Sequence, residues 1–200
     1  MVINDIKAWK MTILYLKFKR WVTGLFLIIM LSPAAYSMPD MSEALSNAKF
    51  LTTQSKNFKL EVFKGQIMLI FFGYTHCPDI CPSTLLDISK SMKDLGKDSE
   101  KVQPIFISVD YKRDTPEHLE TYVKFFDKRI LGLTSDKENL DQITQDFRTQ
   151  YALLDATSKN YLVEHSSNLY VLDQNLQVRR IIANGLPSSE ITKAVKKLLP

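Results

Sequence analysis

Residues 67–92 read IMLIFFGYTHCPDICPSTLLDISKSM and contain the change of pattern that decides the fold. Residues 67–74 are almost entirely apolar and are bounded by glycines, which is typical of a buried strand in a mostly parallel sheet. From Leu85 onward, apolar residues recur every three or four positions, as on one face of a helix. Cys77 and Cys81 lie where the strand gives way to the helix, and ligands gather at such junctions in open α/β sheets.

The alternation of strand and helix continues along the chain. A second buried strand is expected at 105–109, and a helix is expected after Thr115, since Pro116 suits the first helical position. Further expected elements are a loosely ordered N-terminal segment at 38–57 with one short helix or strand, an edge strand at 58–63, a helix at 137–148, a hairpin of 168–172 and 177–182, and a helix at 188–199. This order predicts one α/β domain with helices on both faces of a central sheet.

The first 37 residues differ in kind from the rest. Five basic residues precede an apolar run of 11 residues, Trp21–Leu31, and the small-residue stretch SPAAYS follows it, as in a secretory signal peptide. A bilayer span needs about 20 residues. The alternative is an uncleaved anchor that also uses part of residues 11–16. We therefore expect residues 1–37 to be a signal peptide or N-terminal membrane anchor, and residues 38–200 to lie outside the cytoplasm, in a bacterial periplasm.

The positive charge of the chain belongs to this leader. The net charge is +4, with 26 Lys and Arg against 22 Asp and Glu. Residues 1–37 hold five of the basic residues and one of the acidic ones, which leaves 21 of each in the remainder. We therefore expect no nucleic-acid-binding surface.

Cys77 and Cys81 are the two cysteines of the chain. Pro82 suits the first turn of a helix, so Cys81 should lie near the helix start, where a spacing of four can bring both sulfurs to one side. The partial positive charge of a helix N-terminus favours thiolates, which bind soft metals or exchange with disulfides. The alternative is a pair of buried structural cysteines.

His165 is the candidate for a third ligand. It precedes the expected hairpin, and a hairpin strand that pairs near the sheet centre would bring it to the strand–helix junction. A hydrogen-bonded loop histidine is the alternative. We expect His76 to flank the site and His118 to be solvated. Asp110 and Asp114 are expected to cap a helix or to hold a loop by hydrogen bonds, rather than to form a catalytic carboxylate pair.

Two thiolates and one imidazole favour copper, above all Cu(I). Zinc is the second choice, because structural zinc takes four ligands and catalytic zinc takes three ligands and water. The sequence offers no obvious fourth ligand.

Three blocks of sequence resemble the Sco/SenC family, the thioredoxin-like copper proteins of cytochrome c oxidase assembly. They are FFGYTHCPDICPSTLLDISK, then PIFISVDYKRDTPEHLETYVKFF, then GLTSD with VEHSSNLYVLD. The resemblance runs from about Gly65 to the C-terminus. Tyr111 stands where the family usually has proline, which we expect to alter only loop stiffness, and Glu164 stands where aspartate is common.

The resemblance implies a thioredoxin-like fold with a central mixed sheet flanked by helices on both faces. It also implies that Cys77, Cys81 and His165 bind copper, as Cu(I), Cu(II) or both. The implied role is delivery of copper to the binuclear copper site of cytochrome c oxidase subunit II, or reduction of the thiols of that site. The implied partner is this subunit or another copper or thiol protein, met by a monomer that is periplasmic or membrane-associated.

Other functions stay open at this point. Cys77 and Cys81 could be the catalytic redox pair of a thiol–disulfide oxidoreductase. Their spacing is Cys-x3-Cys, however, and no proline between Pro116 and Pro187 could supply the cis-proline of thioredoxin-type enzymes. A peroxidase would not require His165. A redox or copper sensor cannot be separated from a copper chaperone by sequence, so enzymatic activity is undecided and the chaperone role is favoured.

Overall fold

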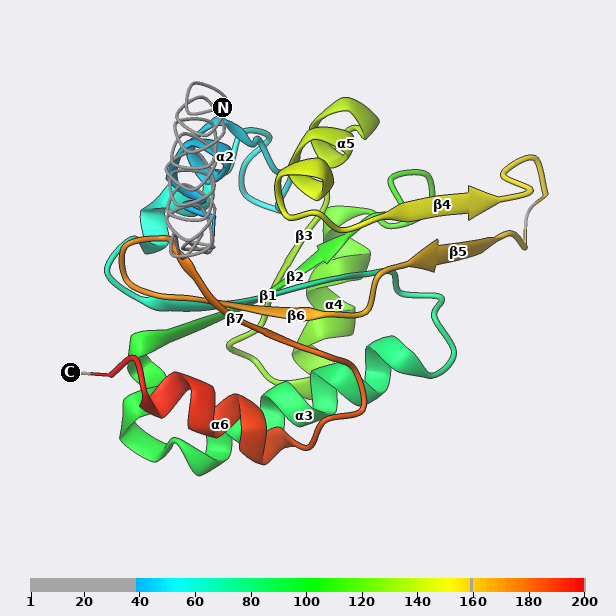
Figure 1. Ribbon diagram of the computed structural model, residues 1–200. Coiled ribbons are helices and arrows are strands. Elements are labelled where there is room, and N and C mark those ends of the chain that lie inside the picture. Colours follow the sequence, from blue (N-terminus) through cyan, green and yellow to red (C-terminus); the bar gives the residue numbers. More distant parts are fainter. Residues whose placement is uncertain (1–38, 159, 200) are drawn as a thin grey trace, which may run out of the picture. The chain divides into compact units, whose positions relative to one another are not determined.

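The computed structural model describes residues 39–158 and 160–199 (Figure 1). The expected signal peptide or anchor, residues 1–37, lies outside the described residues and stays a prediction. Among the described helices, none has the length and apolar character that a bilayer span requires.

A five-stranded mixed sheet, in the order β3-β2-β1-β6-β7, forms the centre of the fold. Strands β1, β2 and β3 run parallel, and β6 pairs antiparallel with both β1 and β7. Every residue of β1 is buried, which explains its unbroken apolar run. The strands are β1 (Ile67–Gly73), β2 (Val102–Ser108), β3 (Leu131–Leu133), β6 (Leu169–Leu172) and β7 (Val178–Ile182).

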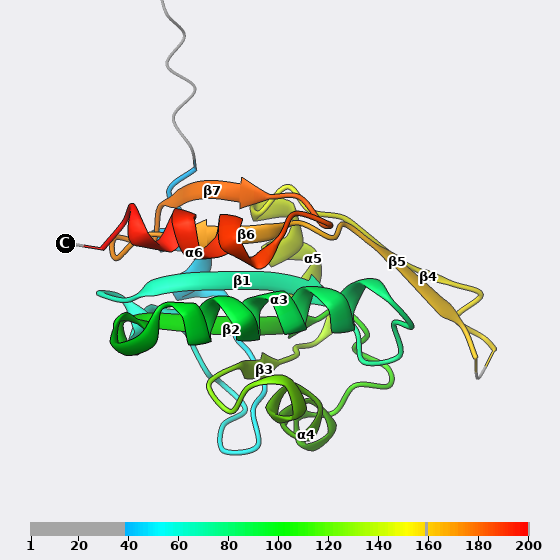
Figure 2. The same ribbon diagram turned by 90° about the horizontal axis from the view of Figure 1, so that it is seen from below.

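Helices cover both faces of this sheet (Figures 1 and 2). One face carries α3, which contacts both α4 and α6, and the other carries α2 and α5. Their bounds are α2 (Ser42–Asn47), α3 (Ile80–Asp94), α4 (Pro116–Phe126), α5 (Lys137–Asp146) and α6 (Ser188–Lys196), with a 3-10 helix η2 (Gly96–Lys101) after α3. The prediction of an α/β domain with helices on both faces of a central sheet is confirmed.

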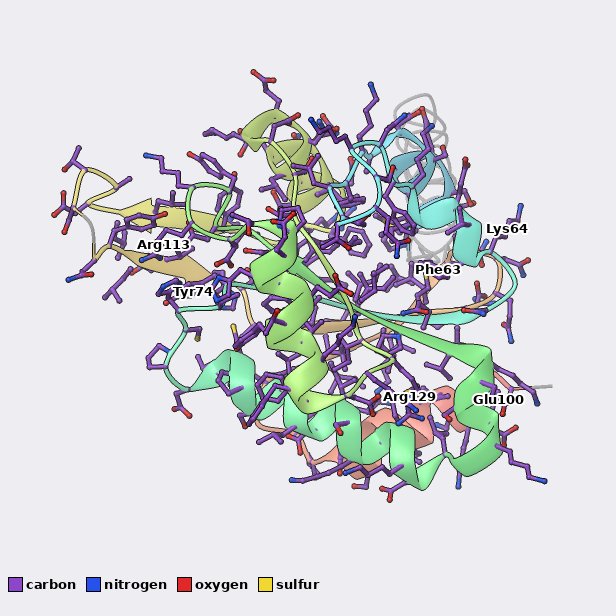
Figure 3. All side chains as sticks on the ribbon, turned by 180° about the vertical axis from the view of Figure 1, so that it is seen from behind. Phe63, Lys64, Tyr74, Glu100, Arg113 and Arg129 are labelled. Atoms are coloured by element: carbon purple, nitrogen blue, oxygen red, sulfur yellow. The ribbon has the colours of Figure 1, made fainter. Side chains whose placement is uncertain are left out.

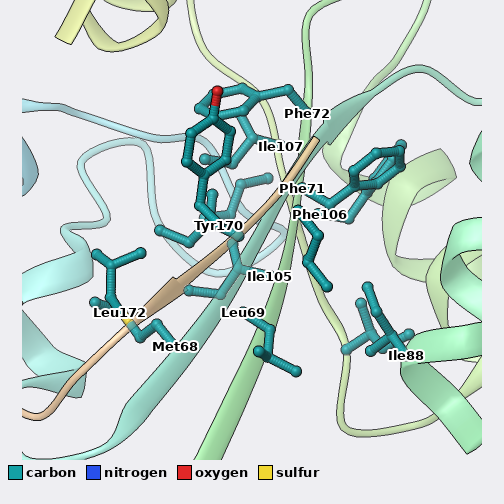
Figure 4. Packing of buried hydrophobic residues seen from close by; sticks show 14 of the residues in the cluster. Met68, Leu69, Phe71, Phe72, Ile88, Ile105, Phe106, Ile107, Tyr170 and Leu172 are labelled. Carbon is teal, nitrogen blue, oxygen red and sulfur yellow. The ribbon is translucent and has the colours of Figure 1, made fainter. Parts of the chain in front are cut away.

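The core lies on both sides of β1 and β2 (Figure 4). Successive side chains of a strand face opposite sides of the sheet. Accordingly, Phe72 packs with Phe147 and Tyr170, at ring-centroid distances of 5.3 and 6.0 Å, while its neighbour Phe71 packs with Phe106 at 6.0 Å. The side of the sheet on which Phe71 lies also carries the two cysteines.

The edge strand predicted at 58–63 is wrong. Its last four residues form a 3-10 helix, η1 (Leu60–Phe63). Residues three apart lie on the same side of a 3-10 helix, so Leu60 and Phe63 both face the core. A strand would have placed Val62 beside Leu60, whereas Val62 is 63% exposed.

The sequence analysis missed β3 and a separate hairpin, β4 (Tyr151–Leu154) and β5 (Leu162–His165). Strand β3 has three residues, too few to show a period. The hairpin forms a two-stranded sheet of its own and projects from the body (Figures 1 and 2). It matters for function because His165 is its last residue.

Candidate metal centre

The loop between β1 and α3 places both cysteines beside the end of β1. Helix α3 begins at Ile80, so Cys81 is in its first turn, as predicted. Pro82 also lies in that turn, where a backbone N–H would have no partner within the helix. The Cys77 N–H donates to the Tyr74 carbonyl at 3.3 Å and closes the turn before the helix. Both cysteines are buried, Cys77 at 9% and Cys81 at 0% exposure.

The Cys81 sulfur packs against the backbone of β1 at Gly73. A Cβ atom on residue 73 would lie 2.6 Å from Cys81 Sγ and 2.7 Å from the Phe106 ring. Both distances are far below a normal contact of about 3.5–4.0 Å. Glycine is therefore required here to let the sulfur approach the strand.

His165 reaches the cysteines from the end of β5. Its Nε2 atom lies 3.5 Å from Cys81 Sγ, and its Nδ1 atom lies 3.0 Å from the Ser166 carbonyl oxygen. A proton on Nδ1 donates to that carbonyl and leaves the Nε2 lone pair facing the sulfurs. The rings of Tyr74 and Phe71 meet the imidazole edge to face, at centroid distances of 5.7 and 6.2 Å, and fix its orientation.

The donor atoms of Cys77, Cys81 and His165 all lie within 4.8 Å of one another. The three candidates predicted from the sequence are therefore brought together by the fold. Two thiolates and one imidazole suit a soft ion such as Cu(I). Within the described part of the chain, no fourth Cys, His, Asp or Glu joins this cluster, so a four-ligand zinc site is not formed here.

The two thiols of the cluster share a proton. A hydrogen bond from the Cys81 thiol lowers the pKa of Cys77 to about 4, and backbone N–H groups of Cys81 and Asp79 assist against the effect of burial. The same hydrogen bond, together with burial, raises the pKa of the Cys81 thiol. At neutral pH the site therefore holds a thiolate at Cys77 and a proton on Cys81, which an incoming soft cation can displace.

Asp114 holds the loops around the site, as the sequence analysis expected. Its carboxylate accepts hydrogen bonds from the Thr75 N–H at 2.9 Å, the Thr75 hydroxyl at 2.6 Å and the Ser108 hydroxyl at 2.5 Å. Thr115 caps α4 by accepting from the His118 N–H at 3.3 Å. These bonds tie the residue before His76 to β2 and α4.

Asp110 ties the hairpin to the body, a contact that the sequence analysis missed. Arg113 Nε donates to Asp110 at 2.5 Å, and Tyr161 donates its hydroxyl proton to the same carboxylate. Arg113 also donates to the Tyr161 carbonyl at 2.9 Å and stacks on its ring at 3.6 Å. Figure 3 shows Arg113 and Tyr74 close together beside the hairpin, and the Arg113 guanidinium lies 6.0 Å from the Tyr74 ring. We call Asp110, Arg113 and Tyr161 the hairpin anchor, because Tyr161 lies four residues before His165.

The remaining histidines lie outside the sulfur cluster. His118 is 47% exposed in its side chain, in agreement with the expectation that it is solvated, and His76 is 51% exposed. Both imidazoles face Asp114 rather than the cysteines.

A sequence model of a protein family and individual relatives of this chain point to the same family. The sequence model of the SCO1/SenC family matches residues 39–200. A SCO2-like protein of Rickettsia prowazekii is 35% identical over 141 residues, which cover 70% of this chain and 69% of the relative. A SCO2-like protein of Rickettsia conorii is 38% identical over 120 residues, which cover 59% of this chain and 58% of the relative.

Solved structures of proteins in this family resemble the chain as well. ScoI of Bradyrhizobium japonicum, determined with copper bound, has a TM-score of 0.69 and 32% identity, and the match covers 78% of this chain and 99% of that one. Yeast Sco1 with copper bound has a TM-score of 0.68 and 27% identity, covering 78% and 91%. These likenesses confirm the thioredoxin-like α/β fold that the sequence resemblance implied.

Proposed function

Since the chain belongs to the SCO1/SenC family, we propose that it binds one copper ion through Cys77, Cys81 and His165 and acts in the assembly of cytochrome c oxidase. The observation that carries this proposal is the convergence of three donor atoms within 4.8 Å from segments far apart in the sequence. Two structural relatives were determined with copper bound, which supports the choice of metal.

The finer proposal is that copper is cargo, delivered to the binuclear copper site of oxidase subunit II. A carrier must hold its ion and release it. Three ligands leave the coordination of the ion open to an incoming thiolate of a partner, which can replace the ligands one at a time. Of the ligands, His165 can move away from the ion most easily, since it lies on the projecting hairpin, whereas Cys81 is packed against β1.

The thiol pair also supports a second candidate function, reduction of the cysteines of that partner site. The Cys77 thiolate would attack a partner disulfide and form a mixed disulfide, releasing one partner thiolate. Cys81 would then give up its proton and attack Cys77, which forms the Cys77–Cys81 disulfide and frees the second partner thiolate. Two electrons pass from this chain to the partner. The low pKa of Cys77 favours this chemistry.

Both functions fit an extracytoplasmic location, which we propose for residues 38–200. A thiol pair used for disulfide exchange or copper transfer works where partner thiols are liable to oxidation. The balanced charge of this part of the chain gives no reason to expect a nucleic-acid partner.

Titration with Cu(I) under anaerobic, reducing conditions, against a chelator of known affinity, tests the proposal. We expect one equivalent per chain, and we expect His165→Ala to weaken binding at least tenfold. Glu164→Gln is the matched control, because this exposed neighbour on β5 points to the opposite side of the strand. Wild-type affinity in His165→Ala would remove the histidine from the site. Cysteine labelling of protein taken from cells would show whether the disulfide form exists as well.

A further inference from the structure

A groove of about 450 Å³ lies at the edge of the sheet that β3 forms. We propose that it binds a small anionic amphiphile, a molecule with an apolar chain and one acidic group such as a carboxylate. Helix α4 packs beside β3 and forms one wall, and the loop before η1 forms the other (Figure 2). None of the residues that line the groove is a ligand in the sulfur cluster, so this binding goes beyond the proposed function.

The floor of the groove is apolar. Phe58 and Phe63 lie with their ring centroids 6.0 Å apart, and both side chains are only partly buried. Val123 of α4 and Leu131 of β3 join them, and Leu131 is also partly buried. Single apolar side chains at a surface are common, whereas a group of them in one concave site, rimmed by polar residues, marks a binding groove.

The groove is elongated along α4. It is lined by Pro116, Glu120, Val123 and Lys124, whose spacing places them on one face of the helix. The eight residues from Pro116 to Lys124 extend over about 12 Å of helix. The volume of about 450 Å³ falls in the range of about 300–1,000 Å³ that is usual for small-ligand sites. An extended apolar chain suits this shape.

The rim of the groove carries one positive charge that no carboxylate balances. The charged residues that line it are Glu120, Lys124, Lys128 and Arg129. Arg129 is held by Asp127 through hydrogen bonds of 2.8 and 2.6 Å, and Lys124 pairs with Glu120. Lys128 is exposed and forms no ion pair within the described part of the chain. Its ammonium group therefore suits a ligand with one negative group.

A ligand in the groove would also complete the cover of an edge strand. Strand β3 pairs with β2 on one side only. On its other side the chain closes the edge at one point, where the Leu51 N–H donates to the Thr134 carbonyl at 2.8 Å. Leu131 and Gly132 line the groove next to that point. Proteins usually cover their edge strands, and an apolar chain bound here would shield the exposed part of Leu131.

Calorimetric titration of the full chain with decanoate, decanol and decyltrimethylammonium tests the proposal. We expect saturable binding of decanoate, weaker binding of the neutral alcohol and no binding of the cation. Lys128→Glu should weaken decanoate binding at least fivefold, whereas Lys128→Arg should retain it because the charge is kept. Lys196→Glu is the matched control, since this lysine is also exposed but lies on α6, outside the groove, and it should leave the affinity unchanged.

Methyl NMR spectra of the same samples locate the ligand. Decanoate should shift the signals of Val123 and Leu131 and leave that of Val195, in the buried face of α6, unchanged. A Cys77→Ser/Cys81→Ser chain should bind decanoate like the wild type, so failure of the proposed copper function would leave this result intact.

Three results would overturn the proposal: no saturable binding of decanoate, equal affinity in Lys128→Glu and the wild type, or binding that leaves the Val123 and Leu131 signals unchanged. The groove would then hold only solvent or a segment of another protein.

Discussion

Replacing Gly73 with alanine should disturb the copper site through a single methyl group. The new Cβ would lie 2.6 Å from Cys81 Sγ and 2.7 Å from the Phe106 ring. Relief to about 3.5 Å requires each neighbour to move by about 0.8–0.9 Å. Neither has free space around it, because Cys81 and Phe106 are both 0% exposed. The sulfur must therefore shift within the site, or the strand must bend.

The expected magnitudes follow from this clash. Overpacking of a core costs about 1–3 kcal/mol in free energy of unfolding. Replacing glycine with alanine returns about 0.4–1 kcal/mol by restricting the unfolded chain, so we expect a net loss of about 1–2 kcal/mol. A site works when its ligands are held within about 0.5 Å. A shift of the Cys81 sulfur beyond that limit should weaken Cu(I) binding at least tenfold, or by about 1.4 kcal/mol.

Two measurements on the same variants separate these effects: urea unfolding of the metal-free protein and competitive Cu(I) titration. Gly132→Ala is the matched control, since its Cβ would meet Leu119 at 3.1 Å and no residue of the site. It should lose stability without losing Cu(I) affinity. If Gly73→Ala binds Cu(I) as tightly as the wild type, the reasoning that β1 fixes the position of the Cys81 sulfur is refuted.

Two further predictions concern the proton on the thiols and the hairpin anchor. Alkylation by iodoacetamide, followed by mass spectrometry from pH 3 to 9, should modify Cys77 at a nearly constant rate above pH 5 and more slowly as the pH falls through about 4, because the lowered pKa keeps the thiolate until then. Cys81 should not be alkylated, because its thiol is buried and its pKa is raised. An alkylation rate of Cys77 that rises only near pH 8–9 would contradict this assignment of the proton to Cys81. Tyr161→Phe removes a hydrogen bond from the buried Asp110 carboxylate and should cost about 1–3 kcal/mol in urea unfolding. The same variant should weaken Cu(I) binding less than His165→Ala does, and equal or greater weakening would mean that the anchor is part of the site itself.

Elements with long, regular patterns could be predicted from the sequence, and the others could not. Strand β1 is buried on every side and so appears as an unbroken apolar run. The start of helix α4 could be predicted from Thr115, which caps it, and from Pro116 at its first position. Residues 161–164 alternate between buried Tyr161 and Val163 and exposed Leu162 and Glu164, but the exposed Leu162 is apolar, so the sequence does not show this as an alternation of apolar and polar residues. The pattern of 58–63 fits a strand and a 3-10 helix equally, and only tertiary packing of Leu60 decides between them.

Some features of the candidate site could likewise be predicted from the sequence, and others could not. The position of Cys81 follows from local helix-start signals, and that of His165 follows from strand pairing, since β6 does pair with β1 and places Leu169 opposite Phe71. The hairpin anchor could not be predicted, because nothing in a single sequence links Arg113 to Tyr161 across 48 positions. Contacts of this kind depend on the geometry of the whole fold.

The division of the ligands between two structural units bears on how a copper carrier could release its ion. Cys81 is held by the core through Gly73, whereas His165 stands on a two-stranded sheet separate from the main one. Elements with few buried contacts open at lower free energy than the core. Loss of the imidazole requires movement of the hairpin, which the buried Tyr161 and Val163 oppose, while loss of the Cys81 sulfur requires disruption of the β1–α3 packing. If the chain carries copper as proposed, we expect His165 to leave the ion first and Cys81 last, with the hairpin anchor setting the free energy of the first step.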